Sequence, residues 1–263
     1  MLLRVITQAR LVPGLAGVAV ATTDQPADGV IEDLCATVKV ACIRGPEEDV
    51  LARYVLAAEQ LGADAVVRLT GDSPLLDPAV IERVLGAFRG HAYASNGHPP
   101  SWYDGTDVEV VSRDALRRAA GAAARHEREH VTTYIWKRPW LFPAANVGLP
   151  GEDYSAIELS VDTGEDLERV RRVVQGLPRR WGWRDVLAAY WEVEIQKRSG
   201  QLFGRTSRKA ERRHAYRTGA LAGIFVNCVN PYSTGIEREQ PLVAAWEFGR
   251  EDAPRFLTTG ASA

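Results

Sequence analysis

Short apolar runs rich in β-branched residues alternate along most of the chain with longer amphipathic stretches. The apolar runs predict strands over residues 17–23 (GVAVATT), 38–43 (VKVACI), 63–72 (ADAVVRLTGD), 106–112 (TDVEVVS) and 157–162 (IELSVD). Residues 47–62, which lie between two of these runs, repeat apolar side chains at helical spacing and predict a helix. This alternation predicts an α/β fold: a mostly parallel, doubly wound sheet with helices on both faces.

The alternation ends near residue 193. We therefore expect a domain over residues 1–193 and a basic, irregular C-terminal extension over residues 194–263. From Gln196 to Arg217 there are eight Lys or Arg residues against one Glu. Such a charge run favours a solvated arm, and an arm that binds anions or docks a partner is the alternative.

Composition narrows the classes of partner. The 263 residues carry a formal charge of −2 and are 46% hydrophobic, so nothing draws the whole molecule toward nucleic acid or an anionic membrane. Cys35, Cys42 and Cys228 form no C-x-x-C pair, which suits a reducing compartment. There is no signal-peptide pattern, and no run approaches the ~20 apolar residues that span a bilayer. We expect a cytoplasmic protein with no nucleic-acid or membrane partner.

One short motif is typical of zinc proteases. His126, Glu127 and His130 have the spacing His-Glu-x-x-His, which on one continuous helix would place two imidazoles on the same face beside a glutamate. The residues that follow lack the H-x-x-G-x-x-H extension and an obvious downstream glutamate ligand on a helix. We therefore do not favour a metalloprotease.

The ends of the predicted strands are unusually polar. Gly71 and Asp72 follow one strand, and Asp162 follows another. In open α/β sheets, ligands bind beyond the carboxyl ends of the strands, so these residues are candidates for a site. A turn role for Asp72 and a helix N-cap role for Asp162 remain alternatives.

Several blocks, taken in order, carry a resemblance to a known family. They are ATTD (21–24), RGPEEDVLARY (44–54), VVRLTGDSPLLDP (66–78), YASNGHPP (93–100), DGTDVEVVS (104–112), EREHVTTYI (127–135) and SVDTGEDLERVR (160–171). In this order the chain resembles the cytidylyltransferases of the spore-coat polysaccharide biosynthesis type, which are relatives of the acylneuraminate and ketodeoxyoctonate enzymes. The EREHVT block belongs to this pattern, in which no protease zinc site is implied.

The resemblance implies transfer of CMP from CTP to a small sugar, expected to be acidic, with release of pyrophosphate for glycan or polysaccharide synthesis. It also implies that Asp72 and Asp162 are the catalytic residues and hold Mg²⁺. Magnesium prefers oxygen ligands and takes one or two carboxylates together with phosphate oxygens. A cation would also keep two neighbouring carboxylates ionised, since they would otherwise repel each other.

Further site residues follow from the same resemblance. On the nucleotide side it implies Thr22, Asp24, Arg53, Gly71 and Ser73. On the sugar side it implies Asn96, Asp107, Glu109 and His130. Asp107 and Glu109 alternate within one predicted strand and would face the same side. A solvated helix charge for Arg53 and a hydrogen-bonded helix residue for His130 are the alternatives. Relatives are often dimers, so a homodimer is possible.

One family feature is missing from the sequence. Members begin with a strand and a basic, glycine-rich loop, approximately R-x-G-S-x-R-L-P-G-K, that cradles the triphosphate. Residues 8–17 (QARLVPGLAG) contain Pro-Gly but no lysine, and residues 1–14 are expected to form the helix that follows this loop. Two readings stay open: an enzyme that needs a further N-terminal segment, or an inactive relative that acts as a binding or scaffold protein. A nucleotide-sugar glycosyltransferase is a third, although TDVEV offers only D-x-E in place of D-x-D.

Overall fold

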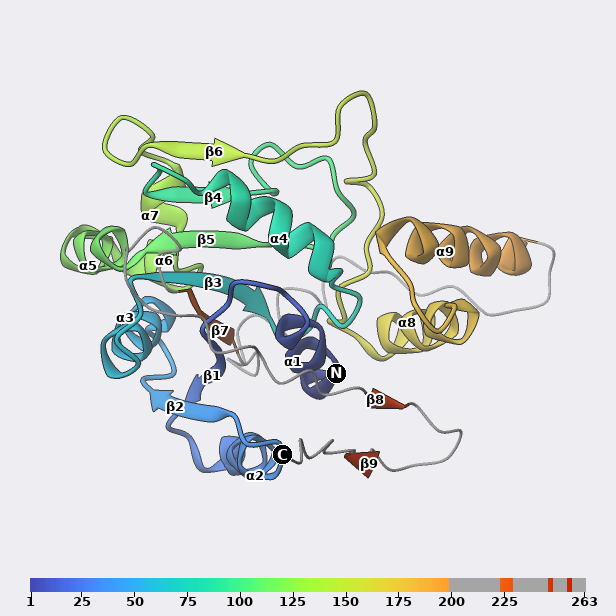
Figure 1. Ribbon diagram of the computed structural model, residues 1–263, viewed down its shortest axis with the longest axis horizontal. Helices are drawn as coiled ribbons and strands as arrows, with labels where there is room; N and C mark the ends of the chain where they lie inside the picture. The colour runs from blue at the N-terminus through green and yellow to red at the C-terminus, as the bar shows by residue number, and fades with distance from the viewer. Residues whose placement is uncertain (199–222, 229–245, 248–254, 257–263) are drawn as a thin grey trace, which may run out of the picture. The chain divides into compact units, whose positions relative to one another are not determined.

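The computed structural model describes residues 1–198, 223–228, 246–247 and 255–256 (Figure 1). The chain divides into two units, Met1–Asn230 and Pro231–Ala263. The described part of the second unit is one antiparallel pair of strands, β8 (Trp246–Glu247) and β9 (Arg255–Phe256).

The first unit is built on a seven-stranded sheet in the order β2-β1-β7-β3-β5-β4-β6. The strands are β1 (Gly17–Thr23), β2 (Ala41–Gly45), β3 (Ala65–Thr70), β4 (Tyr93–Ser95), β5 (Glu109–Ser112), β6 (Ala144–Asn146) and β7 (Gly223–Cys228). The pairings give β1, β2, β3, β4 and β6 one common direction, whereas β5 and β7 run the opposite way.

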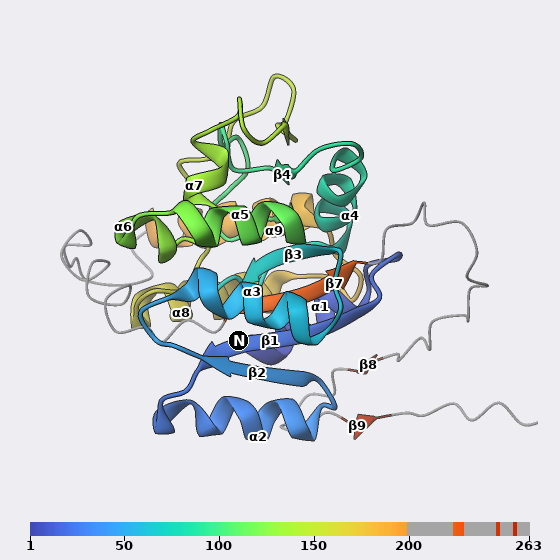
Figure 2. The ribbon, with the colours of Figure 1, turned by 90° about the vertical axis from the view of Figure 1, so that its left-hand side faces the viewer.

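Helices cover both faces of this sheet. The helices are α1 (Leu2–Arg10), α2 (Gly29–Thr37), α3 (Val50–Gln60), α4 (Pro78–Ala87), α5 (Arg113–Ala122), α6 (Arg125–Arg128), α7 (Thr133–Trp136), α8 (Gly164–Gly176) and α9 (Trp183–Arg198), with a 3₁₀ turn, η1, at Pro26–Asp28. Side chains of α1, α2 and α4 pack on one face, and those of α3, α5 and α7 pack on the other. Helices α3 and α5 face the viewer in Figure 2. The α/β fold with helices on both faces is thus confirmed, and among the described helices none has the length and apolar character to cross a membrane.

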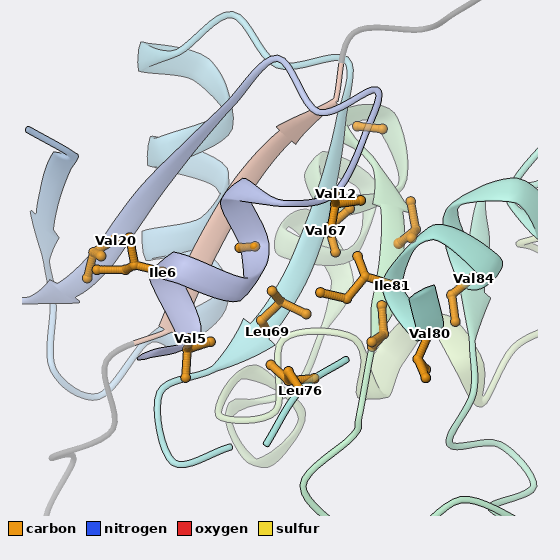
Figure 3. Close-up of a cluster of buried hydrophobic side chains, with 14 of the residues drawn as sticks. Val5, Ile6, Val12, Val20, Val67, Leu69, Leu76, Val80, Ile81 and Val84 are labelled. Atoms are coloured by element: carbon orange, nitrogen blue, oxygen red, sulfur yellow. The ribbon is translucent and has the colours of Figure 1, made fainter. Parts of the chain in front are cut away.

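Alternation along the strands explains why the sheet has two cores. In β3, Val67 and Leu69 belong to the cluster that Val5 and Ile6 of α1 complete, whereas Val66 belongs to the opposite cluster. Figure 3 shows the first cluster between α1, α4 and the sheet. Successive side chains of a strand point to opposite faces, so an apolar run is buried on both sides. Each such fully buried side chain contributes about 1.5–3 kcal/mol.

Three predicted strands are shorter than expected. The strand predicted over residues 63–72 is β3, which spans only Ala65–Thr70. Residues 38–43 were predicted as a strand, but β2 begins at Ala41 because Lys39 has a φ of 54° and turns the chain. Residues 106–112 were predicted as one strand, but β5 begins at Glu109. The side chain of Asn96 hydrogen-bonds the backbone at residues 106 and 108 and so replaces a neighbouring strand there.

The strand predicted over residues 157–162 is wrong. The segment is extended and buries Ile157, Leu159 and Val161 in a third apolar cluster with α8 and α9. Its backbone, however, bonds two separate places: the Leu159 N–H donates to the Asp104 carbonyl and the Val161 N–H to the Asp72 carbonyl, both at 2.9 Å. Alternation therefore records burial here, not pairing with a strand.

Strand β7 lies in the segment that was expected to be an irregular extension. It occupies the position between β1 and β3 and is antiparallel to both, with Gly223 opposite Ala21 on one side and Thr70 on the other. The expected domain boundary at residue 193 stays a prediction, although the first unit runs on to Asn230. Because backbone N–H and C=O groups inside a sheet need partners, β7 completes the sheet at its centre.

A pair of truncations tests the role of β7. Removing residues 223–263 leaves the facing edges of β1 and β3 unpaired, so we expect the free energy of unfolding to fall by about 3 kcal/mol or more, given about 0.5–1.5 kcal/mol for each backbone hydrogen bond lost. Removing only residues 231–263 deletes the second unit and serves as the control, with an expected change of about 1 kcal/mol or less. Urea denaturation followed by circular dichroism measures both, and equal losses for the two truncations would contradict this role.

Candidate active site

The predicted site residues gather at one edge of the sheet. Strands β1, β2, β3, β4 and β6 all end at this edge, and the antiparallel β5 begins there, since Glu109 pairs with Arg68 near the end of β3. The residues at these strand ends are Thr22, Asp24, Gly71, Asp72, Ser73, Asn96, Asp107 and Glu109. The carboxyl edge of an α/β sheet is where ligands bind, because the loops that follow the strands converge there.

A backbone hydrogen bond ties the segment that carries Asp162 to Asp72, although the two residues are far apart in the sequence. The backbone N–H of Val161 donates to the carbonyl oxygen of Asp72 at 2.9 Å, so the residue before Asp162 is bonded directly to Asp72. The Asp72 side chain is buried, and the Ser73 hydroxyl donates to its Oδ1 at 3.0 Å. Thr163 caps α8, so the alternative in which Asp162 caps this helix is wrong. Ser73 therefore orients one carboxylate, and the second lies on the adjoining segment.

A glycine allows this approach. Gly105 has a φ of +101°, and a Cβ placed on it would lie 2.8 Å from the carbonyl carbon of Leu159. Any other residue would push away the segment that leads to Asp162, and non-glycine residues also rarely adopt this φ. The turn at residues 104–106 (DGT) thus sets how closely the segment that leads to Asp162 can approach.

The donor set at this point suits a hard divalent cation. Asp72 and Asp162 offer carboxylate oxygens, the ligands that Mg²⁺ prefers. In the described part of the chain, no group of three or more His, Cys, Asp or Glu side chains could hold a metal. A cation held by two carboxylates would take its remaining ligands from a phosphate-bearing ligand and water, which is the usual behaviour of Mg²⁺. The residues present therefore fit this metal.

Arg53 is the most unusual charged group at the edge. It is only 2% exposed, and its Nε and Nη1 have no hydrogen-bond partner in the structure. Gly45 makes room for it, because a Cβ on that glycine would lie 2.9 Å from the Arg53 Cγ. Burial lowers the pKa of Arg53, while Tyr54 and nearby carboxylates act to raise it. Buried donors normally find acceptors, so two unmatched N–H groups point to a ligand rich in acceptors.

The end of β1 is held by a residue that the sequence did not single out. The Asp28 carboxylate accepts hydrogen bonds from the Thr22 hydroxyl at 2.7 Å and from the Thr23 hydroxyl at 2.5 Å. Thr22 is therefore engaged inside the protein. Asp24 is exposed, and its backbone N–H donates to the Gly45 carbonyl at 2.9 Å. The Asp24 side chain is thus open to solvent beside the end of β2.

Two of the residues expected on the sugar side are buried and hydrogen-bonded within the protein. The Asn96 amide donates to the Thr106 carbonyl and accepts from the Val108 N–H, both at 2.8 Å. The Glu109 carboxylate accepts from Arg68 and other donors and is 6% exposed. The expectation that Asp107 and Glu109 share one strand is wrong, because Asp107 precedes β5.

Asp107 and His130 are the exposed members of this side. Asp107 keeps accessible surface, yet desolvation, together with the carboxylates of Asp104 and Glu109, raises its pKa to about 7. His98 follows β4 in the sequence, and its ring stacks on that of Trp136 with ring centroids 4.3 Å apart. Burial lowers the pKa of His98, so this imidazole is neutral at pH 7. The solvent-exposed residues among those expected on the sugar side are therefore Asp107 and His130, and both are polar.

The protease-like motif does not form a zinc site. Helix α6 ends at Arg128, so His126 and His130 do not share one helix. The Glu127 carboxylate instead accepts from the Ala124 N–H at 3.1 Å and from Arg138 at 2.8 Å. Glu127 thus holds the start of α6, and the alternative in which His130 is a helix residue is wrong.

An α/β sheet whose carboxyl edge carries paired carboxylates and a buried arginine with free donors is typical of proteins that bind nucleotides. A sequence profile of cytidylyltransferases matches residues 1–188. The chain belongs to the cytidylyltransferase family.

Three relatives illustrate the similarity. An uncharacterised protein of Methanocaldococcus jannaschii is 34% identical over 160 residues, which cover 59% of this chain and 64% of that protein. The spore coat polysaccharide biosynthesis protein SpsF of Bacillus subtilis is 32% identical over 162 residues, 59% of this chain and 66% of SpsF. A 3-deoxy-manno-octulosonate cytidylyltransferase of Anaeromyxobacter dehalogenans is 31% identical over 208 residues, 65% of this chain and 85% of that enzyme. The chain thus spans about two thirds of the length of the first two.

Solved structures agree on the fold. A cytidylyltransferase from Leptospira borgpetersenii superposes with a TM-score of 0.68 at 25% identity, covering 79% of this chain and 87% of that one. The CMP:2-keto-3-deoxy-manno-octonic acid synthetase, in a complex with CTP, superposes with a TM-score of 0.51 at 18% identity, covering 66% of this chain and 87% of that one. The second likeness concerns the fold alone.

The raised pKa of Asp107 predicts a pH-dependent effect of substitution. Its pKa lies above that of an aspartate in the unfolded chain, so ionising the group destabilises the fold as pH rises from about 4 to about 7 and the cost persists above that. We expect Asp107→Asn to raise the melting temperature at pH 8 and to change it little at pH 4. Differential scanning calorimetry at both pH values measures this. A gain confined to pH 4, or none at either pH, would contradict the assignment.

Proposed function

We propose that this protein transfers CMP from CTP to a sugar hydroxyl, with release of pyrophosphate, in the synthesis of a polysaccharide or related glycan. The observation that carries the proposal is the hydrogen bond from Val161 to Asp72, which brings two carboxylate-bearing segments together at the carboxyl edge of the sheet. Membership of the cytidylyltransferase family supports the use of CTP. The relatives named as 3-deoxy-manno-octulosonate cytidylyltransferases support an acidic sugar as the acceptor.

Asp72 and Asp162 hold the cation in this proposal. Mg²⁺ held by these residues would lower the negative charge on the phosphates. The contribution of the chain is alignment: Asp72 is fixed by Ser73, and Asp162 is fixed by the backbone bond of its neighbour Val161. Phosphoryl transfer requires mainly positioning and charge neutralisation from the protein, so two fixed carboxylates are a sufficient core.

Arg53 binds the nucleotide in this proposal. Its Nε–H and Nη1–H groups have no partner in the structure, so the buried guanidinium keeps two donors for acceptor atoms of a ligand. Asp24, exposed at the end of β1, is close enough in the sheet to contribute a further polar contact. On the acceptor side, Asp107 and His130 have the exposed polar groups that can bind sugar hydroxyls.

Pyrophosphate release tests the activity directly. The chain is incubated with CTP, Mg²⁺ and each of a panel of sugars that includes 3-deoxy-manno-octulosonate and N-acetylneuraminate. We expect release with at least one acidic sugar and a preference for CTP over ATP, GTP and UTP. Binding of CTP without turnover on any sugar would contradict the proposal and indicate a non-catalytic relative.

The metal ligands make a sharp prediction. We expect Asp72→Asn and Asp162→Asn each to lower the rate of pyrophosphate release by about 10²-fold or more, because each removes a charge that holds the cation. Both variants should keep the circular dichroism spectrum of the parent. Asp33→Asn, at an exposed position on α2, is the matched control and should keep the parent rate. A parental rate in either site variant would refute the assignment of these ligands.

Substituting Arg53 should change affinity and stability in opposite directions. Arg53→Met removes the donors proposed to bind the nucleotide, so we expect the dissociation constant for CTP to rise about tenfold or more. The same change removes a buried charge without hydrogen-bond partners at Nε and Nη1, so the melting temperature of the free protein should stay level or rise. Calorimetry measures both quantities. Unchanged CTP affinity would exclude Arg53 from the site.

A further inference from the structure

Glu109 is the centre of a buried hydrogen-bond network that joins four parts of the fold. Its Oε2 accepts from Arg68 Nη1 on β3 at 2.6 Å. Its Oε1 accepts from the Tyr93 hydroxyl on β4 at 2.5 Å and from the hydroxyl of Thr132. Thr132 lies in the turn between α6 and α7, so the network ties that turn to three neighbouring strands.

The protonation states make this network permanent at neutral pH. Burial acts to raise the pKa of Glu109, but Arg68, Thr132 and Tyr93 lower it below its usual value. Burial, and then the Glu109 charge, raises the pKa of Tyr93 well above that of a free tyrosine, so the hydroxyl stays a donor. A charged acceptor with neutral and charged donors forms the strong class of hydrogen bond.

The turn that this network holds is strained. Val131 is fully buried and has a φ of 52°, a conformation that is a genuine outlier for a β-branched residue. The next residue, Thr132, also donates its backbone N–H to the His130 carbonyl. A strained residue persists only where its surroundings over-determine it, and such residues gather at functional sites. Here the Glu109 carboxylate holds the turn through the hydrogen bond that it accepts from the Thr132 hydroxyl.

The turn presents the exposed groups of the acceptor side. His130 directly precedes Val131, and α7, which begins at Thr133, carries the Trp136 ring that stacks on His98. At the other end of the network, Arg68 lies in β3, the strand that leads to Asp72. One carboxylate therefore links the strand of a proposed metal ligand to the loop and helix that carry the open polar groups.

We propose that Glu109 is a positioning residue, which together with Arg68, Tyr93 and Thr132 holds the strained turn at Val131 and thereby sets His130 and the His98–Trp136 stack at a fixed place relative to Asp72. Glu109 acts through its neighbours in this proposal, since both of its carboxylate oxygens already accept hydrogen bonds inside the protein. The description of His130 and His98 as an acceptor side rests on the proposed function. The link between Glu109 and the turn is the hydrogen bond from Thr132, and it does not depend on the proposed function.

Thr132→Val tests the link with the least change in shape. It removes the hydroxyl that Glu109 accepts, whereas Thr132→Ser keeps a hydroxyl and is the matched control. Thr132→Ala, which adds no bulk, replaces the valine variant if that variant does not fold.

The first readout is the set of histidine ring resonances in two-dimensional NMR spectra, which requires no turnover. We expect Thr132→Val to shift or broaden the resonances of His130 and His98 while those of His91 stay in place. Thr132→Ser should keep the parent positions of His130. Unchanged His130 and His98 resonances in Thr132→Val, or equal shifts at His91, would overturn the proposal.

The second readout separates the two halves of the site. We expect Thr132→Val to keep the dissociation constant for CTP within about twofold of the parent and to raise the KM for 3-deoxy-manno-octulosonate, or for whichever panel sugar is turned over, by about tenfold. A loss of CTP affinity equal to the change in KM would indicate general structural damage and overturn the proposal. If the parent itself turns over no sugar, the proposed function fails while the NMR result still decides the link.

Discussion

The proposed site depends on one backbone hydrogen bond, from the N–H of Val161 to the carbonyl of Asp72. It joins the end of β3 to a segment that is nearly ninety positions away in the printed sequence and belongs to no strand. Gly105 permits that segment to approach, because a side chain there would collide with its backbone. Main-chain geometry therefore holds the backbone that leads to Asp162 against Asp72.

The polar residues of this edge divide into two groups. Thr22, Asn96 and Glu109 are buried and bonded within the protein, so they shape the loops around the site. Asp107 and His130 are exposed, and Arg53 is buried with donors that lack acceptors. A residue in a family motif can thus act on the substrate or on its neighbours. Asp107 and His130 differ from the first group in their exposure to solvent.

Sequence patterns predicted the architecture well, but they did not predict the side-chain hydrogen bonds between distant elements that hold the loops around the site. The strand at residues 17–23 follows from its apolar, β-branched run, and the helix near the N-terminus was expected from the family resemblance; both are confirmed. The error at residues 157–162 arose because burial on one side gives the same alternation as strand pairing. The roles of Asp28 and Thr132 depend on contacts between distant elements, which periodicity does not encode. Arg68 was detectable, since a charged residue inside an apolar strand calls for a buried partner, and Glu109 lies directly opposite.

The fold also shows how a sheet can be completed from a distant part of the chain. Strand β7 sits between β1 and β3 in the antiparallel sense, so the two strands that lead to Thr22 and Asp72 are both hydrogen-bonded to it.

The most direct test of the proposal that Asp72 and Asp162 hold one cation is anomalous X-ray diffraction from crystals of the protein grown with CTP and Mn²⁺ in place of Mg²⁺. The account predicts an anomalous peak bridging the carboxylates of Asp72 and Asp162, and a bound manganese that contacts neither of them would contradict it.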